Sequence, residues 1–364
     1  MCSSDLVRRT VSTVSLVSVV SGVLLMLIGI GVSRPILELM DTPADVLDMA
    51  VLYLRLYFVG IPFFLIFNFG AAILRSVGDT RRPLYILVVA GVINTVLNLV
   101  LVICFGLGVE GVAIATAIAN MVSAACIVVL LRREKGALQL QFNHMRIYGK
   151  ELRRMLQIGV PAGLQGMVFS LSNVVVQSAI NGYGSAAIAG SAAAVNFEYY
   201  CYYIIVACNG AAISFIGQNY GAGKYDRVRR IFRICMLMGL VGCFAANALF
   251  TWQNHFFLSF FTADPEVIHY GAIRMQGVLL FQFLACSYEI SGSALRGMGE
   301  SMLPTIMTVF GTCVLRMVWV FVVSPHYHGF AQLLQVYPLS WVLTGAMVLV
   351  AYHVRMKKLC AVRA

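Results

Sequence analysis

The sequence predicts an all-α polytopic membrane protein, and three features support this: its composition, its long apolar runs and its charge pattern. Of the 364 residues, 60% are hydrophobic and only 11% are charged, and the mean hydropathy is +0.86. Soluble domains carry about 25% charged residues. These values exclude a soluble globular enzyme, a disordered chain and a disulfide-rich secreted module.

Ten apolar runs approach or exceed the roughly 20 residues that a helix needs to cross a bilayer. Helices are expected because backbone polar groups in lipid must be satisfied within the segment. The strands of a porin-like barrel would be shorter and would alternate in polarity. The predicted spans are roughly 11–32, 50–74, 83–105, 109–131, 156–180, 186–216, 231–252, 268–294, 304–323 and 333–354.

The charges in the connections alternate between the two sides of the predicted membrane. Most of the 26 Lys and Arg residues fall on one side, including Arg75, Arg132 and Lys224. The opposite loops carry acids such as Asp41 and Asp264. The positive-inside rule makes the basic side cytoplasmic, with both termini there, in the inner (plasma) membrane. The net charge of +11 is therefore explained by the orientation of the chain in the membrane, and no nucleic-acid partner is expected.

The sequence offers no set of residues for catalysis or for a resident cofactor. The ten Cys residues form no C-x-x-C pair and have no metal-ligand spacing with His. There is no P-loop, no H-E-x-x-H and no G-x-S-x-G. We expect a protein that is not an enzyme and that has no cofactor and no dedicated metal site.

An internal repeat relates the two halves of the chain. Leu74-Arg75-x-x-Gly78-Asp79 recurs as Leu295-Arg296-x-x-Gly299-Glu300, and Val7-Arg8-Arg9 recurs as Val228-Arg229-Arg230 at the same separation. Both copies start on the cytoplasmic side, so the repeats are parallel. We expect an N-lobe at 1–131, a basic cytoplasmic linker at 132–154 and a C-lobe at 155–364.

The two predicted lobes are unequal, with four spans in the first and six in the second. By symmetry, about 70 residues holding two spans would precede Val7 in a 6 + 6 protein. The sequence therefore favours an N-terminally truncated chain. A natural ten-helix protein is the alternative.

The repeated turn is predicted to be a hinge and a cytoplasmic fastening rather than a substrate site. Glycine permits a tight turn, proline suits the first helical position, and the acid and hydroxyl can cap the next helix. The turn residues are Gly78, Asp79, Pro83, Gly299, Glu300 and Pro304.

Two acids, Glu198 and Glu289, lie deep within predicted spans of the second lobe. Charges in a membrane are costly and are functional candidates by default. They can exchange protons, or bind Na⁺ together with other oxygen ligands. The alternative is that each carboxylate is the structural partner of a buried cation, with Arg316 as the obvious candidate.

Polar, aromatic and Met residues suggest where substrate and ion bind. Asn94 and Asn98 share one helix face and can bind a cation or a substrate hydroxyl, or simply join helices by hydrogen bonds. Aromatic faces attract cations and Met surfaces adapt to varied shapes, which suits a promiscuous organic-cation cavity. The cavity candidates are Asn68, Tyr199, Tyr202, Met167, Gln165 and Arg316. An interfacial aromatic belt is the alternative.

Several motifs resemble those of the MATE (multidrug and toxic compound extrusion) family. They include Gly159-Val160-Pro161-Ala162, Gly217-Gln218-x-x-Gly221-Ala222 and the repeated Leu-Arg-x-x-Gly-acid turn. The resemblance implies two six-helix lobes around a central cavity, with Asn94 and Asn98 matching an N-lobe cation site. The chain departs from the pattern in its fifth span, which lacks a Glu, and at Ala285, one turn from Glu289.

We therefore predict a monomeric secondary antiporter that exports organic cations or drugs in exchange for H⁺ or Na⁺. The cycle would proceed by alternating access between the two lobes. The alternatives are a lipid or polysaccharide flippase of the same superfamily and an inactive fragment.

Overall fold

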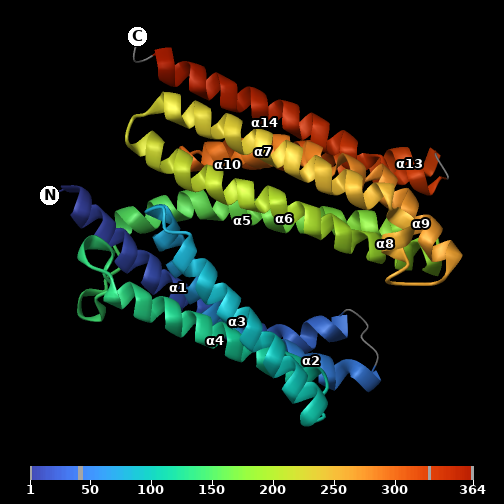
Figure 1. Ribbon diagram of the computed structural model, residues 1–364, viewed down its shortest axis with the longest axis horizontal. Coiled ribbons are helices and arrows are strands. Elements are labelled where there is room, and N and C mark those ends of the chain that lie inside the picture. The colour runs from blue at the N-terminus through green and yellow to red at the C-terminus, as the bar shows by residue number, and fades with distance from the viewer. Residues whose placement is uncertain (1, 40–43, 327–328, 362–364) are drawn as a thin grey trace. The chain divides into compact units, whose positions relative to one another are not determined.

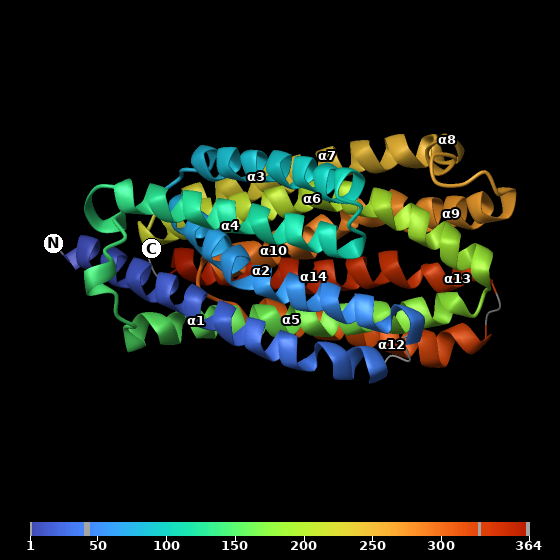
Figure 2. The ribbon, with the colours of Figure 1, turned by 90° about the horizontal axis from the view of Figure 1, so that it is seen from below.

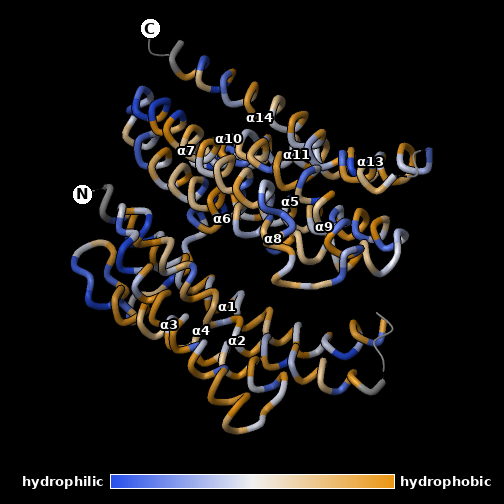
Figure 3. Tube along the Cα trace, turned by 45° about the vertical axis from the view of Figure 1, so that its right-hand side comes forward, coloured by the Kyte–Doolittle hydropathy of each residue, from blue (hydrophilic) through white to orange (hydrophobic). Residues whose placement is uncertain are grey.

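The predicted all-α, polytopic class is confirmed by the computed structural model, which describes residues 2–39, 44–326 and 329–361. Within these residues, ten helical segments are long and apolar enough to cross a membrane, as predicted. Hydrophobic residues run along the helices and hydrophilic residues gather near their ends (Figure 3). The segments are Asp5–Leu39, Val46–Ser76, Arg81–Cys104, Val109–Arg133, Gly149–Asn181, Ser185–Gly221, Tyr225–Trp252, Pro265–Gly297, Met302–His326 and Phe330–Leu359.

The chain divides into two compact units, Met1–Met155 and Leu156–Ala364. The helices of the first unit are α1 (Cys2–Leu39), α2 (Ala44–Ser76), α3 (Arg81–Leu99) and α4 (Val109–Arg133). Helix α2 packs against both α1 and α4, and α3 packs against α4 (Figure 1). The core of this unit is small and includes Ala71, Leu74, Ile127 and Leu131.

The basic segment 132–154 folds onto the first unit. It contains two 3₁₀ turns, Gly136–Leu138 and Phe142–His144. Backbone groups of Arg146 exchange hydrogen bonds with the Ser12 hydroxyl at 2.7 and 2.8 Å, so the segment is held against α1. No α-helix forms between the end of α4 at Arg133 and the start of α5 (Gly149–Asn181).

The second unit holds the larger core. Its helices are α5 (Gly149–Asn181, whose first turns lie in the first unit), α6 (Ser185–Gly221), α7 (Tyr225–Trp252), α8 (Asn254–Leu258), α9 (Pro265–Gly277), α10 (Cys286–Gly297), α11 (Met302–Thr308), α12 (Leu315–Val318), α13 (Phe330–Leu334) and α14 (Val336–Ala361). Helix α6 contacts α7, α9 and α10, and α10 also contacts α14 (Figure 2). Apolar side chains such as Phe197, Met275 and Ile290 fill the space between them.

Besides the short break at Gln335 between α13 and α14, two spans of the second unit are interrupted, although the sequence predicts continuous helices there. A 3₁₀ segment, Leu279–Ala285, separates α9 from α10, and π-helical segments flank α12 at Val309–Val314 and Trp319–Val323. Irregular backbone at membrane depth is tolerated where protein surrounds it. The span that contains Leu279–Ala285 is the most buried of the ten. Gln282 of the 3₁₀ segment and Arg316 of α12 both line the cavity of this unit.

Candidate functional site

A cavity of about 350 Å³ lies within the second unit. It is bounded by residues of α5, α6, α9, α10, α12 and α14 and of the 3₁₀ segment between α9 and α10. The residues that define its chemistry are Glu198, Tyr202, Arg274, Arg316, Tyr337 and Trp341. Clefts of this size, lined by aromatic side chains with a few polar groups, are typical of small-molecule sites.

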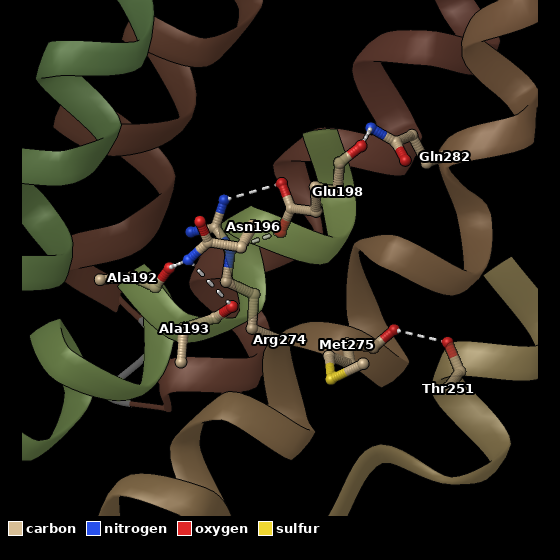
Figure 4. Close-up of polar contacts among 8 residues, drawn as sticks. All are labelled: Ala192, Ala193, Asn196, Glu198, Thr251, Arg274, Met275 and Gln282. Carbon is tan, nitrogen blue, oxygen red and sulfur yellow. Dashed lines mark hydrogen bonds and ion pairs between the residues drawn. The ribbon is translucent and has the colours of Figure 1, made fainter. Parts of the chain in front are cut away.

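Glu198 is held by Arg274 in a two-point ion pair. Arg274 Nε donates to Glu198 Oε1 at 2.6 Å, and Nη2 donates to Oε2 at 3.1 Å (Figure 4). The side chain of Glu198 is only 13% exposed and that of Arg274 only 4%. Such planar, charge-assisted contacts are strong and directional. Glu198 is therefore an ion-paired carboxylate whose charge is already matched.

The cation beside Glu198 is Arg274, whereas the sequence pointed to Arg316. The reason is that α9 packs directly against α6, which brings Arg274 next to Glu198. Gln282, in the 3₁₀ segment that follows α9, donates from Nε2 to the backbone carbonyl of Glu198 at 3.1 Å (Figure 4). The interruption of this span thus supports the ion pair from a second direction.

Arg316 lies on the same cavity but without an acidic partner. Its side chain is 1% exposed, and Nη1 donates to Asn173 Oδ1 at 2.6 Å. Its guanidinium lies over the rings of Phe169 and Tyr337, at 5.0 and 4.6 Å from their centroids. Among the described residues, its Nε has no hydrogen-bond partner and no carboxylate forms an ion pair with it.

Glu289 has a different environment from Glu198. The Tyr202 hydroxyl donates to Glu289 Oε1 at 3.2 Å, and Asn209 Nδ2 donates to Oε2 at 2.9 Å. Both partners are neutral. Tyr202 also lines the cavity, whereas Glu289 does not. The two predicted carboxylates thus differ in their partners: Glu198 has a fixed cation and Glu289 has neutral donors.

The polar residues of the first unit form a short network of neutral groups. Asn98 Nδ2 donates to Asn94 Oδ1 at 3.1 Å, and Asn94 Nδ2 donates to Thr116 Oγ1 of α4 at 3.3 Å. These bonds join α3 to α4, as the interhelical alternative expected. Asn68 is not part of the network and donates to the carbonyl of Phe64 in its own helix. Ion binding by Asn94 and Asn98 stays a prediction.

Three of the predicted cavity residues, Asn68, Gln165 and Met167, do not line the cavity of the second unit. Gln165 Oε1 accepts hydrogen bonds from Arg296 at 3.3 Å and from Thr305 at 3.2 Å, which ties α5 to α10 and α11. The side chain of Met167 is 63% exposed. Tyr199, Tyr202 and Arg316 do line the cavity.

Several residues of the site were not predicted from the sequence: Asn209, Gln282, Tyr337 and Trp341. Part of the signal was present. Glu198, Tyr202 and Asn209 are spaced to share one face of a helix, and so are Tyr337 and Trp341. The partnership of Gln282 with Glu198 depends on the interrupted span, which has no clear sequence signature.

The two repeated turns have the same backbone geometry. Gly78 and Gly299 have φ values of +89° and +88°, a region that favours glycine. The amides of Asp79 and Glu300 donate to the carbonyls of Leu74 and Leu295 at 3.1 and 2.9 Å. The hinge role stays a prediction.

The capping expected at these turns is only partly present. Neither hydroxyl, Thr80 nor Ser301, caps its helix, and the Ser301 hydroxyl donates to the carbonyl of Ile158 instead. Asp79 does accept from the backbone amide of Arg82 at 3.2 Å. Burial acts to raise the pKa of the Asp79 carboxyl, but hydrogen bonds and charge from Arg82 hold this pKa below its ordinary value.

The prolines of these turns also sit later than expected. Pro83 and Pro304 are the third residues of α3 and α11, whereas the sequence placed each at the first helical position. Both positions lie within the first turn, where a missing N–H leaves no helical hydrogen bond unmade.

Comparisons with known proteins agree with this architecture. The family described as MatE matches residues 3–100 and 161–322. The chain is 29% identical to the probable multidrug resistance protein YoeA of Bacillus subtilis, over 89% of this chain and 72% of that protein. It is 26% identical to a FAD transporter of Shewanella oneidensis, over 65% of this chain and 53% of that protein. Several other relatives are matched over less than two thirds of their own length.

Among solved structures, the fold is similar to the outward-facing conformation of a multidrug resistance MATE family transporter of the MOP superfamily. The TM-score is 0.90 at 20% identity, covering 99% of this chain and 83% of the other. The fold is also similar to that of the Vibrio cholerae MATE transporter VcmN in its bent form, with a TM-score of 0.84 at 19% identity, covering 98% and 83%.

Proposed function

Since this chain belongs to the MatE family of membrane transporters, which are not enzymes, we propose that it exports small organic molecules in exchange for H⁺ or Na⁺. Transport would proceed by alternating access, with the ion binding one conformation more tightly than the other. A monomer is sufficient for this mechanism. The multidrug names of its relatives support drug-like substrates.

The single observation that carries the ion-coupling proposal is the environment of Glu289. Its hydrogen-bond donors, Tyr202 and Asn209, are neutral, and no ion pair involves it among the described residues, so Arg296 acts on it only through charge at a distance and leaves the carboxylate able to gain a proton or a Na⁺. Asn209 Oδ1 is buried without a partner among the described residues and offers a second oxygen to Na⁺. Glu198 cannot respond in this way while it stays paired with Arg274.

The contact between Glu289 and Tyr202 gives a route from the ion to the substrate. Tyr202 donates to Glu289 and also lines the cavity. Binding of an ion at Glu289 would release or turn the Tyr202 hydroxyl and so change the wall of the cavity. Differential contacts of this kind are what coupling requires.

Organic cations are the substrates that the sequence favours, because aromatic faces attract cations, whereas the two arginines of this cavity act against a cation there. The runner-up is a lipid or polysaccharide flippase, which a cavity lined with cations favours. Arg274 and Arg316 are the observation that supports it.

Transport by the purified chain in proteoliposomes tests the proposal. We expect ethidium, an organic cation, to accumulate when a pH or Na⁺ gradient is imposed, and this accumulation to be lost in Glu289→Gln. Glu266→Gln is the matched control, because it removes an exposed carboxylate of the same unit at the start of α9. Full gradient-driven transport by Glu289→Gln would remove this residue from the mechanism, and no transport by the wild type under either gradient would reject antiport.

A further inference from the structure

The charges that line the cavity of the second unit do not cancel. Arg274 and Arg316 contribute two positive charges, and Glu198 contributes one negative charge. Arginine stays protonated in proteins, so neither positive charge can be removed by titration. The ion pair with Glu198 satisfies Arg274. The remaining charge belongs to Arg316.

The environment of Arg316 leaves its positive charge unmatched among the described residues, as in an anion-binding site. Its guanidinium is 1% exposed and meets the neutral amide of Asn173 and the faces of two aromatic rings. Arg316 lines the cavity, and its buried Nε has no partner among the described residues. A buried charge is costly unless it is paired, and pairing an Arg with an oxyanion recovers this cost.

Glu289 does not supply the missing negative charge. Its two oxygens accept from Tyr202 and Asn209, and the carboxylate does not line the cavity. Arg274, which lines the same cavity, carries the same charge as Arg316 and repels it. The shared ring of Tyr337 lies against both guanidinium groups, at 5.4 and 4.6 Å from their carbons.

The other walls of the cavity are largely aromatic. They include Phe169, Tyr199, Tyr288, Tyr337 and Trp341. Flat rings pack against such walls in offset-stacked or edge-to-face arrangements. The volume of about 350 Å³ accommodates a compound with two or three fused rings.

We propose that this cavity binds an organic anion, in which a carboxylate, phosphate or sulfonate is attached to an aromatic ring system. The oxyanion accepts hydrogen bonds from Arg316, including its free Nε–H, and the ring packs against Tyr337 and Trp341. The inference rests on the proposed transport function for its physiological meaning, since the bound anion would be cargo. The same oxyanion chemistry could come from a soluble aromatic acid or from the headgroup of an acidic lipid.

Direct binding of a charge series tests this inference. The probes are radiolabelled 1-naphthoate, the neutral isostere 1-naphthamide and the cation 1-naphthylmethylammonium, each measured on the whole chain in nanodiscs of zwitterionic lipid. We expect naphthoate to bind about tenfold more tightly than either of the others. Equal or tighter binding of the amide or the cation would overturn the proposal.

Variants assign the binding to Arg316. Arg316→Met should weaken naphthoate binding about tenfold and leave naphthamide binding within about twofold, whereas Arg316→Lys should retain part of the preference for the anion. Arg227→Met, an exposed arginine at the start of α7, is the matched control and should change neither. Glu198→Gln makes the cavity more positive and should tighten naphthoate binding. Equal losses for naphthoate and naphthamide in Arg316→Met would contradict the assignment.

A competition arm identifies the source of the anion. If phosphatidylglycerol added to the nanodiscs displaces naphthoate from the wild type, but not the residual naphthoate from Arg316→Met, the cavity takes a lipid headgroup. If it displaces nothing, the ligand is a soluble aromatic acid. If the chain binds naphthoate but does not transport ethidium, anion binding is supported and antiport is rejected. If it transports ethidium under a gradient but does not bind naphthoate, antiport is supported and anion binding is rejected.

Discussion

The two units use their polar residues in different ways. In the first unit, Asn94, Asn98 and Thr116 form a chain of neutral hydrogen bonds between two helices. In the second unit, Arg274 and Glu198 form a buried ion pair beside Arg316, whose charge no acid matches among the described residues. The second unit also has the larger core and the 3₁₀ segment Leu279–Ala285 within a span, whereas π-helical segments occur in both units, at Val100–Cys104 in the first.

This difference shows that the internal repeat preserves backbone geometry while the chemistry of each copy is its own. The turns at Gly78 and Gly299 are alike to within a degree in φ and share a hydrogen-bond pattern. The polar side chains within the spans differ, because those of the first-unit network are neutral whereas those around the cavity of the second unit include charged groups. A repeat in sequence therefore indicates where helices turn and does not indicate where ligands bind.

The largest effect is expected from breaking the buried ion pair. Arg274→Met leaves Glu198 without its cation, and removing one partner of a buried pair costs about 3–5 kcal/mol of stability. Thermal unfolding in detergent measures the loss. The double variant Arg274→Met with Glu198→Gln removes both charges and should recover much of the stability. A double variant as unstable as the single one would show that packing, rather than charge, holds these residues.

A smaller effect is expected at the contact that joins Glu289 to the cavity. Tyr202→Phe removes the donor to Glu289 Oε1, and hydrogen bonds to charged groups contribute about 1.5–3 kcal/mol. We expect lower thermal stability and weakened coupling of ethidium transport to the imposed gradient. Tyr203→Phe, one residue along α6 and 64% exposed, is the control. Equal coupling of transport to the gradient in both variants would show that the hydrogen bond between Tyr202 and Glu289 does not contribute to coupling.

Substitutions at the two repeated turns test whether their shared backbone geometry contributes equally to stability. Gly78→Ala and Gly299→Ala each force a side chain into the left-handed region, at a cost of about 1–2 kcal/mol. A Cβ at either position meets no atom within 4 Å, so the cost is that of the backbone alone. Chemical denaturation should give equal losses at the two positions. A clear difference between the two losses would show that the two turns contribute differently to the free energy of unfolding.

The smallest effect is expected in the neutral network of the first unit. Asn94→Leu removes its hydrogen bonds to Asn98 and Thr116, and hydrogen bonds between membrane helices contribute about 0.6 kcal/mol on average. Thermal unfolding should therefore change little. If instead the variant abolishes gradient-driven transport at normal stability, the asparagines bind the coupling ion and the contrast between the units fails.

Sequence patterns predicted the fold more completely than the site. Apolar runs located all ten spans because burial in lipid demands long hydrophobic segments, and Gly78 and Gly299 marked the two turns. Partners within the membrane were harder to predict, because they depend on which helices pack together. Arg274 meets Glu198 only because α9 lies against α6, and Gln282 reaches it only because the helix is interrupted before α10.

The central claim is that Glu289 exchanges the coupling ion while Glu198 stays a fixed anion. Infrared difference spectroscopy of the carboxyl groups, recorded between two pH values and between Na⁺ and choline at constant ionic strength, tests it most directly. We expect a carboxyl signal in the wild type that disappears in Glu289→Gln and persists in Glu198→Gln. A signal that persists in Glu289→Gln and disappears in Glu198→Gln would contradict it.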